Sequence, residues 1–176
     1  MKAIIISGAL AQDHEFIYPF YRVLEAGFEL DVCIIGGKPA TGILGTLLPP
    51  NKEHPVKDIH QVEPKNYDLL ILPGGVKAME KIRQEKKLIN FISEFHKLDR
   101  VIACICSGVQ LLISAKIVKG KNISGYYSLK DDIINAGANY VDEPAVIDSK
   151  IVTTAHYKDM GPWMKAVLKF FDEKKR

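Results

Sequence analysis

The apolar, β-prone run Val101–Ile105 ends at Cys106, and a helix-like segment starts after Gly108. This pattern predicts a strand, a sharp turn and a helix, with a thiol at the bend. Ligand sites of parallel sheets lie at the carboxyl ends of strands, and a helix N-terminus has partial positive charge. Both effects favour a thiolate, so we expect Cys106 to be reactive, with a pKa well below the ~8.5 of a free cysteine.

Strand patterns alternate with helix patterns along the chain, which predicts a mainly parallel sheet with helices on both faces. The 176 residues suit a single α/β domain, a flavodoxin-like three-layer sandwich spanning 1–176. In a flavodoxin-like strand order, the strands at 2–7, 68–72 and 101–105 are neighbours. Their following loops would then meet at one edge of the sheet and form one pocket. The other expected elements are strands at 29–35 and 122–124, helices at 13–26, 85–98, 130–136 and from 162 onward, and a hairpin at 145–154.

Composition excludes several classes of protein. The net charge of +3 is too small to indicate nucleic-acid binding, and the basic tail at 174–176 is read as a solvated helix end. Three cysteines, two of them in strand-like runs, indicate a reducing compartment, so a cytoplasmic location is expected. No run approaches the ~20 apolar residues of a membrane helix. The histidines lack metal-ligand spacing, and we expect neither a metal nor a cofactor.

Cys106 is the leading candidate nucleophile, although a free cysteine is often only a small buried hydrophobe. Cys104 and Cys33 are expected in the core. Gly74 and Gly75 follow a core strand and could form an oxyanion hole with the N–H of Ser107, because glycine allows close approach of backbone donors to a substrate. A plain strand-to-loop turn is the alternative.

Three further residues could complete the pocket. Glu15, at the start of the first helix, could lie beside Cys106 and share a proton with it, or could simply stabilise the helix dipole. His156 follows the last strand and could act as an acid–base partner of the thiol, or be an exposed loop residue. Tyr126 could line the pocket wall, or be an aromatic residue at the rim of the core.

Together these residues resemble the ThiJ/PfpI superfamily, which includes a protein deglycase, intracellular Pfp-type proteases and related glutamine amidotransferases. The resemblance covers nearly the whole chain. It rests on the segments Glu15–Pro19 with Glu25–Gly27, Tyr67–Gly75, Ala103–Gly108 and Ser128–Asp132 with Asn135–Ala138.

The resemblance implies a flavodoxin-like sandwich that usually forms a homodimer or a larger assembly. It also implies that Cys106 is the nucleophile, that Glu15 bonds to it, and that Gly74 and Gly75 form the oxyanion-hole loop. In the protease-like branch a histidine follows the nucleophile, where this chain has Ser107, and the deglycase branch has a histidine near the position of Tyr126.

The candidate nucleophile predicts a cofactor-independent cysteine enzyme. The resemblance implies that it acts on reactive carbonyls such as methylglyoxal and its adducts, with glyoxalase- or deglycase-like chemistry and a role in stress response. The alternatives are a Pfp-type cysteine peptidase or amidase acting on peptides, with His156 as base, and a non-enzymatic redox-sensing stress protein in which Cys106 is oxidised.

Overall fold

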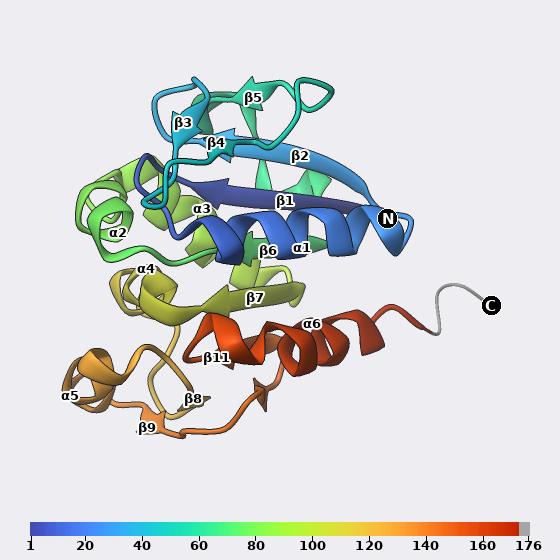
Figure 1. Cartoon of the computed structure of the whole chain (residues 1–176). Helices are drawn as coiled ribbons and strands as arrows, with labels where there is room; N and C mark the ends of the chain where they lie inside the picture. Colours follow the sequence, from blue (N-terminus) through green and yellow to red (C-terminus); the bar gives the residue numbers. More distant parts are fainter. Residues whose placement is uncertain (173–176) are drawn as a thin grey trace.

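A seven-stranded sheet forms the centre of the molecule in the computed structural model, which describes residues 1–172 (Figure 1). The basic tail at 174–176 lies outside the described residues. The strand order is β10-β11-β7-β6-β1-β2-β5, and all neighbours are parallel except β10 and β11. The strands of this sheet are β1 (Lys2–Ser7), β2 (Glu29–Ile34), β5 (Val56–Lys57), β6 (Leu69–Leu72), β7 (Val101–Ile105), β10 (Val146–Asp148) and β11 (Ile151–Thr154).

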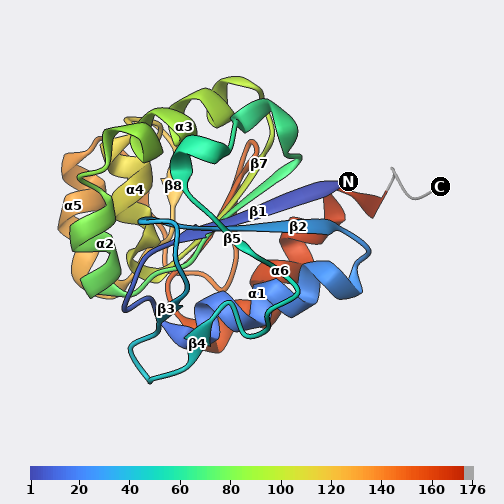
Figure 2. The same ribbon diagram turned by 90° about the horizontal axis from the view of Figure 1, so that it is seen from above.

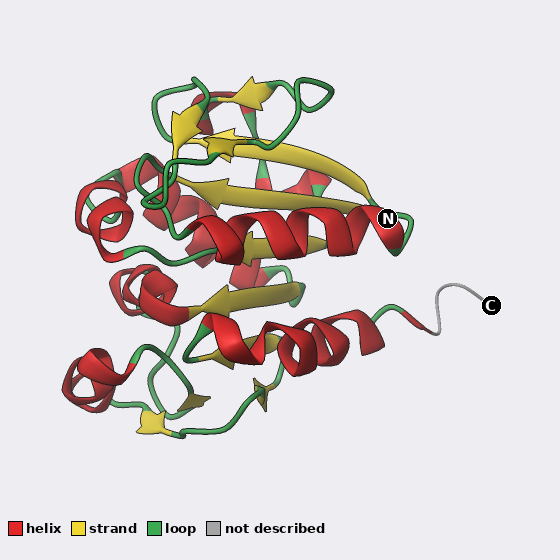
Figure 3. Ribbon diagram, viewed as in Figure 1, coloured by secondary structure: helices red, strands yellow, loops and turns green. Residues whose placement is uncertain are grey.

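Helices cover both faces of the sheet, as Figures 2 and 3 show. Helices α1 and α6 lie on one face, and α2, α3 and α4 lie on the other. The helices are α1 (Asp13–Glu25), α2 (Val76–Ile82), α3 (Lys86–Lys97), α4 (Val109–Ser114), α5 (Lys130–Asn135) and α6 (Met160–Lys169). Two small sheets pair β3 (Ala40–Thr41) with β4 (Leu47–Leu48) and β8 (Asn122–Ile123) with β9 (Asn139–Tyr140).

The predicted α/β sandwich is confirmed, and its central strands are buried on both faces. Every residue of β6 and β7 is buried, as expected of apolar strands in a doubly covered parallel sheet. The predicted neighbours β1, β6 and β7 are adjacent. The sequence reading missed α2, and α6 begins at Met160, two residues before the expected start at Pro162.

Helix α1 shows why these segments fold locally as they do. Gln12 caps its first turn by accepting the N–H of His14. Phe16, Phe20 and Val23 recur at helical spacing and are fully buried against the sheet. Burial of this apolar stripe fixes the rotation of the helix about its axis and therefore turns the buried Glu15 toward the neighbouring loops.

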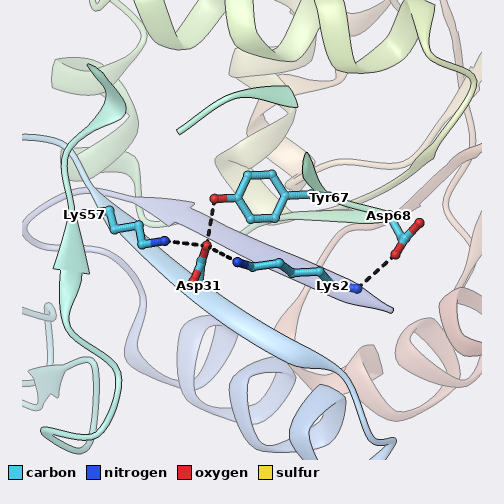
Figure 4. A network of polar contacts seen from close by, with 5 residues as sticks. All are labelled: Lys2, Asp31, Lys57, Tyr67 and Asp68. Atoms are coloured by element: carbon cyan, nitrogen blue, oxygen red, sulfur yellow. Dashed lines mark hydrogen bonds and ion pairs between the residues drawn. The ribbon is translucent and has the colours of Figure 1, made fainter. Parts of the chain in front are cut away.

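A polar network ties the amino-terminal part of the sheet together (Figure 4). Oδ2 of Asp31 on β2 contacts Nζ of Lys2 at 2.9 Å, Nζ of Lys57 at 2.7 Å and the hydroxyl of Tyr67 at 2.8 Å. The backbone N–H of Lys2 donates to Asp68 at 2.9 Å. Burial raises the pKa of Asp31, but the bonds from Lys57, Lys2 and Tyr67 outweigh it and hold the pKa below its usual value.

We expect Asp31→Asn to lower the free energy of unfolding by about 1–3 kcal/mol at pH 7, because it removes the charge that three donors share. The pKa of Asp31 is lowered in the folded protein, so its contribution is present above the unfolded value of 3.8 and is lost as pH falls through the folded value. Urea unfolding at pH 7 and at pH about 2 tests this, because the difference from wild type should shrink in acid.

Glu25→Gln is the matched control. The Glu25 carboxylate is 73% exposed, and within residues 1–172 its one ion pair is with Arg22 on the same helix, so its loss should change stability very little. A difference between Asp31→Asn and wild type that is equal at both pH values would contradict the role assigned to the carboxylate charge.

Candidate active site

The turn at Cys106 joins the end of β7 to α4 and has a strained backbone. Cys106 has φ of 60°, a left-handed conformation that non-glycine residues rarely adopt and that costs roughly 1–3 kcal/mol. Gly108 lets this turn pack closely, because a Cβ there would lie 2.8 Å from the carbonyl oxygen of Leu72. The strand–turn–helix predicted from the sequence is confirmed, and it presents a partly exposed thiol at the carboxyl edge of the sheet.

Glu15 lies beside this thiol, and its carboxyl group is almost completely buried. The residue is only 1% exposed to solvent. Its Oε2 atom accepts a hydrogen bond from the backbone N–H of Gly74 at 2.8 Å. Burial raises the pKa of Glu15 to about 7, although hydrogen bonds from the Cys106 thiol and from Gly74 oppose the shift. The structure therefore brings Glu15 and Cys106 together, as the sequence predicted.

The expected low thiol pKa is contradicted. Burial, followed by the charge of Glu15, raises the pKa of Cys106 to about 12, although the N–H and hydroxyl of Ser107 act in the opposite direction. Two groups this close titrate as a pair. Once one of them has lost its proton, the negative charge and the burial of both groups make the second proton harder to remove. The helix N-terminus that suggested a free thiolate is thus outweighed by burial and by the neighbouring carboxylate.

The predicted role of Gly74 as an oxyanion-hole donor is not supported by the structure. Its N–H is already bonded to Glu15, so it is not a free donor for an oxyanion. The glycine is required for a different reason, since a Cβ there would lie 2.5 Å from Oε2 of Glu15 and 2.9 Å from Cβ of Cys106. Gly75 lines the pocket with φ of 104°, and a Cβ on it would collide with the backbone of Gln12 at 2.5 Å. Gly75 is therefore the member of the pair that is placed to offer an N–H to a bound substrate.

Ser107 and Tyr126 both line the pocket. The Ser107 side chain is buried, and its hydroxyl lies close enough to the Cys106 sulfur to lower the pKa of the thiol. The backbone N–H of Tyr126 donates to the carbonyl of Cys106 at 3.1 Å, and this bond holds the segment after β8 against the strained turn.

His156 also lines the pocket, but among the hydrogen bonds of the described residues none joins its ring to the thiol. Its Nδ1 accepts the backbone N–H of Lys158 at 3.2 Å, which places the proton of a neutral ring on Nε2. Its ring packs against Tyr157 with centroids 4.0 Å apart. In this arrangement the other ring nitrogen is a donor rather than a base.

The pocket has a volume of about 390 Å³ and takes residues from several loops at the carboxyl edge of the sheet. It includes five residues that the sequence reading did not assign to it: Gln12, Ile43, Leu44, Val76 and Tyr157. Two larger surface hollows lie elsewhere and contain neither Cys106 nor Glu15. We take the smaller pocket as the site because it alone among these three holds the candidate nucleophile.

The loop between β3 and β4 reaches this pocket because Asp13 holds it. The Asp13 carboxylate accepts the backbone N–H groups of Leu44 at 2.7 Å and Thr46 at 2.9 Å. Burial raises the pKa of Asp13, but these bonds outweigh it and hold the pKa below its usual value. Gly42 packs so tightly on the carboxylate that a Cβ would lie 2.3 Å from Oδ1. The loop is therefore fixed to the amino end of α1, next to Glu15.

Comparison with known proteins agrees with this architecture. The sequence profile of the DJ-1/PfpI family matches residues 1–170. The chain belongs to the DJ-1/PfpI family. Deglycase PfpI of Pyrococcus furiosus is 32% identical over 174 residues, covering 96% of this chain and 98% of its own length. YraA of Bacillus subtilis, whose name describes a proposed cysteine protease, is 33% identical over 150 residues. The match covers 85% of this chain and 85% of YraA.

Solved structures of the DJ-1/PfpI family have the same fold. A two-domain protein of Anabaena variabilis with a DJ-1/ThiJ/PfpI-like and a ferritin-like domain has a TM-score of 0.89 at 27% identity, over 97% of this chain and 50% of its own. DJ-1beta of Drosophila melanogaster has a TM-score of 0.86 at 21% identity, over 96% of this chain and 90% of its own. The second likeness supports the fold alone.

Within residues 1–172 no helix has the length and apolar character needed to cross a bilayer. The same part of the chain contains no group of three or more histidine, cysteine, aspartate or glutamate side chains arranged to hold a metal ion.

We expect the burial of Glu15 to make stability fall as pH rises. Its pKa is raised in the folded protein, so the stabilising neutral form is fully populated below the unfolded value of 4.5 and is lost as pH rises through about 7. Relative to Glu15→Gln, wild type should lose about 3 kcal/mol of unfolding free energy between pH 4 and pH 8, since each unit of pKa shift corresponds to about 1.4 kcal/mol.

Urea unfolding of wild type and Glu15→Gln across this range measures the difference. Glu80→Gln is the control, because that exposed carboxylate makes only a 3.7 Å contact with Lys77. Parallel stability profiles for wild type and Glu15→Gln would show that Glu15 ionises in the folded protein as it does in the unfolded chain.

Proposed function

We propose that this chain is a cofactor-independent cysteine enzyme that converts small reactive 2-oxoaldehydes such as methylglyoxal, and their adducts, into hydroxy acids. The observation that carries the proposal is the Glu15–Cys106 pair in the pocket, in which a buried carboxyl group and the candidate thiol are hydrogen-bonded to each other. A group whose pKa lies close to the working pH can both donate and accept a proton efficiently. The deglycase names of several relatives agree with chemistry on carbonyl adducts.

In the first step, the Glu15 carboxylate takes the proton of the Cys106 thiol, and the sulfur attacks the aldehyde carbon of methylglyoxal. The carbonyl oxygen gains the electron pair and faces the N–H of Gly75. The N–H of Ser107, which bonds to the sulfur before the attack, becomes the second donor as the sulfur gives up its charge. Glu15 then gives its proton to this oxygen. The product is a hemithioacetal, and Glu15 is left as a carboxylate.

In the second step, the Glu15 carboxylate removes the hydrogen on the former aldehyde carbon as a proton, and the electron pair moves to the ketone oxygen to give an enediolate. This oxygen takes the proton of the neighbouring hydroxyl group, and Glu15 then returns its proton to the former ketone carbon. The product is a thioester of lactate, so one carbon is oxidised and its neighbour is reduced without an external oxidant. Water then cleaves the thioester and releases lactate and the free thiol. The buried, low-dielectric position of Glu15 favours its alternation between acid and base.

We expect Cys106→Ala to lower lactate formation from methylglyoxal by more than about a thousandfold, because the covalent adduct cannot form. Lactate should be measured enzymatically, since loss of methylglyoxal alone also reports adducts with surface lysines and arginines. Cys33→Ala is the control, because that thiol is buried in the core and remote in the sheet order from the pocket. Equal lactate formation by Cys106→Ala and wild type would end the proposal.

A peptidase or amidase is the second candidate, and it is favoured by one observation, the presence of His156 in the pocket with Cys106. Such an enzyme needs a base that takes the thiol proton and returns it to the leaving amine. His156 has its accepting nitrogen engaged by Lys158, so we expect His156→Ala to lower lactate formation by less than tenfold. Peptide or amide hydrolysis by wild type that disappears in His156→Ala would instead favour the peptidase.

A further inference from the structure

The mouth of the pocket is surrounded by large apolar side chains that are left exposed. Leu44 is 62% exposed and Ile43 is 49% exposed, both on the loop between β3 and β4. Val76, at the start of α2, is 48% exposed, and Tyr126 and Tyr157 are 39% and 43% exposed. Single exposed apolar residues are ordinary, but a group of them around one hollow marks a place where apolar ligand surface is buried.

Ile43 and Leu44 are held in place rather than left to move. The Asp13 carboxylate binds the N–H of Leu44, and the N–H of Ile43 donates to the carbonyl of Ala11 at 2.9 Å. These bonds fix the loop to the segment before α1, beside the first turn from which Glu15 projects. Such a loop can present a shaped surface to a substrate with little loss of conformational entropy on binding.

The charge of the pocket limits the kind of substituent that it can accept. Among the described residues that line it, none is a lysine or an arginine, and the groups that can ionise are Glu15, Cys106, His156 and the two tyrosines. A phosphate or carboxylate on the substrate would therefore find no lysine or arginine side chain in the pocket to pair with. An apolar substituent would instead cover Ile43, Leu44 and the tyrosine rings.

The size of the pocket points in the same direction. Its volume of about 390 Å³ lies in the range of sites that enclose drug-sized molecules. Methylglyoxal would occupy only the part next to the sulfur and would leave the apolar mouth in contact with water.

We propose that the site selects 2-oxoaldehydes with an aryl or branched alkyl substituent, and that Ile43 and Leu44 determine this specificity. The inference rests on the proposed function for the identity of the reacting group. The aldehyde carbon lies against Cys106, and the bonds made and broken are those given for methylglyoxal. The substituent extends toward the loop between β3 and β4, where Ile43 and Leu44 remove it from water.

The first test compares kcat/KM for phenylglyoxal and methylglyoxal, measured as mandelate and lactate formed. Wild type should prefer phenylglyoxal by at least about tenfold, the effect of burying most of a phenyl ring. Leu44→Ser should lower this preference by about fivefold or more, chiefly through a higher KM for phenylglyoxal. Leu47→Ser is the matched control, because Leu47 is a leucine of the same hairpin, is 51% exposed and does not line the pocket.

The second test separates the specificity inference from the proposed function. Mandelamide and lactamide are neutral, unreactive and differ only in the substituent, so their dissociation constants report the apolar mouth without any turnover. Wild type and Leu47→Ser should bind mandelamide at least about tenfold more tightly than lactamide, and Leu44→Ser should lose most of this difference.

Aldehyde turnover and amide binding together separate the proposed function from the specificity inference. Discrimination between the amides without turnover of either aldehyde would support the inference and refute the proposed function. Turnover of methylglyoxal that depends on Cys106, with no preference for mandelamide or phenylglyoxal, would leave the proposed function standing and overturn the inference. An equal loss of preference in Leu44→Ser and Leu47→Ser would also overturn it.

Discussion

The hydrogen bond from the N–H of Gly74 to the buried Glu15 carboxyl group joins the parts of the structure on which the site depends. It links the first helix to the loop after β6, and it does so directly beside Cys106. A carboxyl group removed from water needs such a donor, and the Cys106 thiol supplies a second hydrogen bond to it. The proton shared by the pair, and the shift of the pKa of Glu15 to about 7, follow from this burial.

Much of the fold could be predicted because its strands are continuous apolar runs. The runs that became β1, β6 and β7 each end in a recognisable turn, and the neighbour rule for parallel sheets then brings their ends together. Helix α2 was missed because it has only seven residues, begins immediately after Gly75 and buries only a small apolar stripe. A short helix of this kind forms through tertiary packing, and its periodicity is too brief to read.

The sequence was enough to predict which residues gather at the candidate site. It was not enough to predict the pKa values of these residues or the groups to which their backbone N–H donors bond. A position at a strand end and a helix start identifies Cys106, yet its pKa depends on burial and on Glu15, which only the folded arrangement supplies. Gly74 was assigned to an oxyanion because glycine signals close approach, but the approaching group is the protein's own carboxylate. Ile43 and Leu44 lie between two glycines, which is only a weak sequence signal for a binding loop. Their loop is held at the pocket by hydrogen bonds to Asp13, about thirty residues away in sequence.

The loop between β3 and β4 lies outside the central sheet (Figure 2). The side-chain hydrogen bonds that hold it to the rest of the domain are those from its backbone N–H groups to the Asp13 carboxylate. Its sequence can therefore change without disturbing the strands or the acid–thiol pair, provided that Asp13 keeps its two amide donors. Evolution, or an engineer, could graft a different loop onto the same scaffold as a modular part. A single catalytic apparatus could in this way be redirected among chemically different aldehydes.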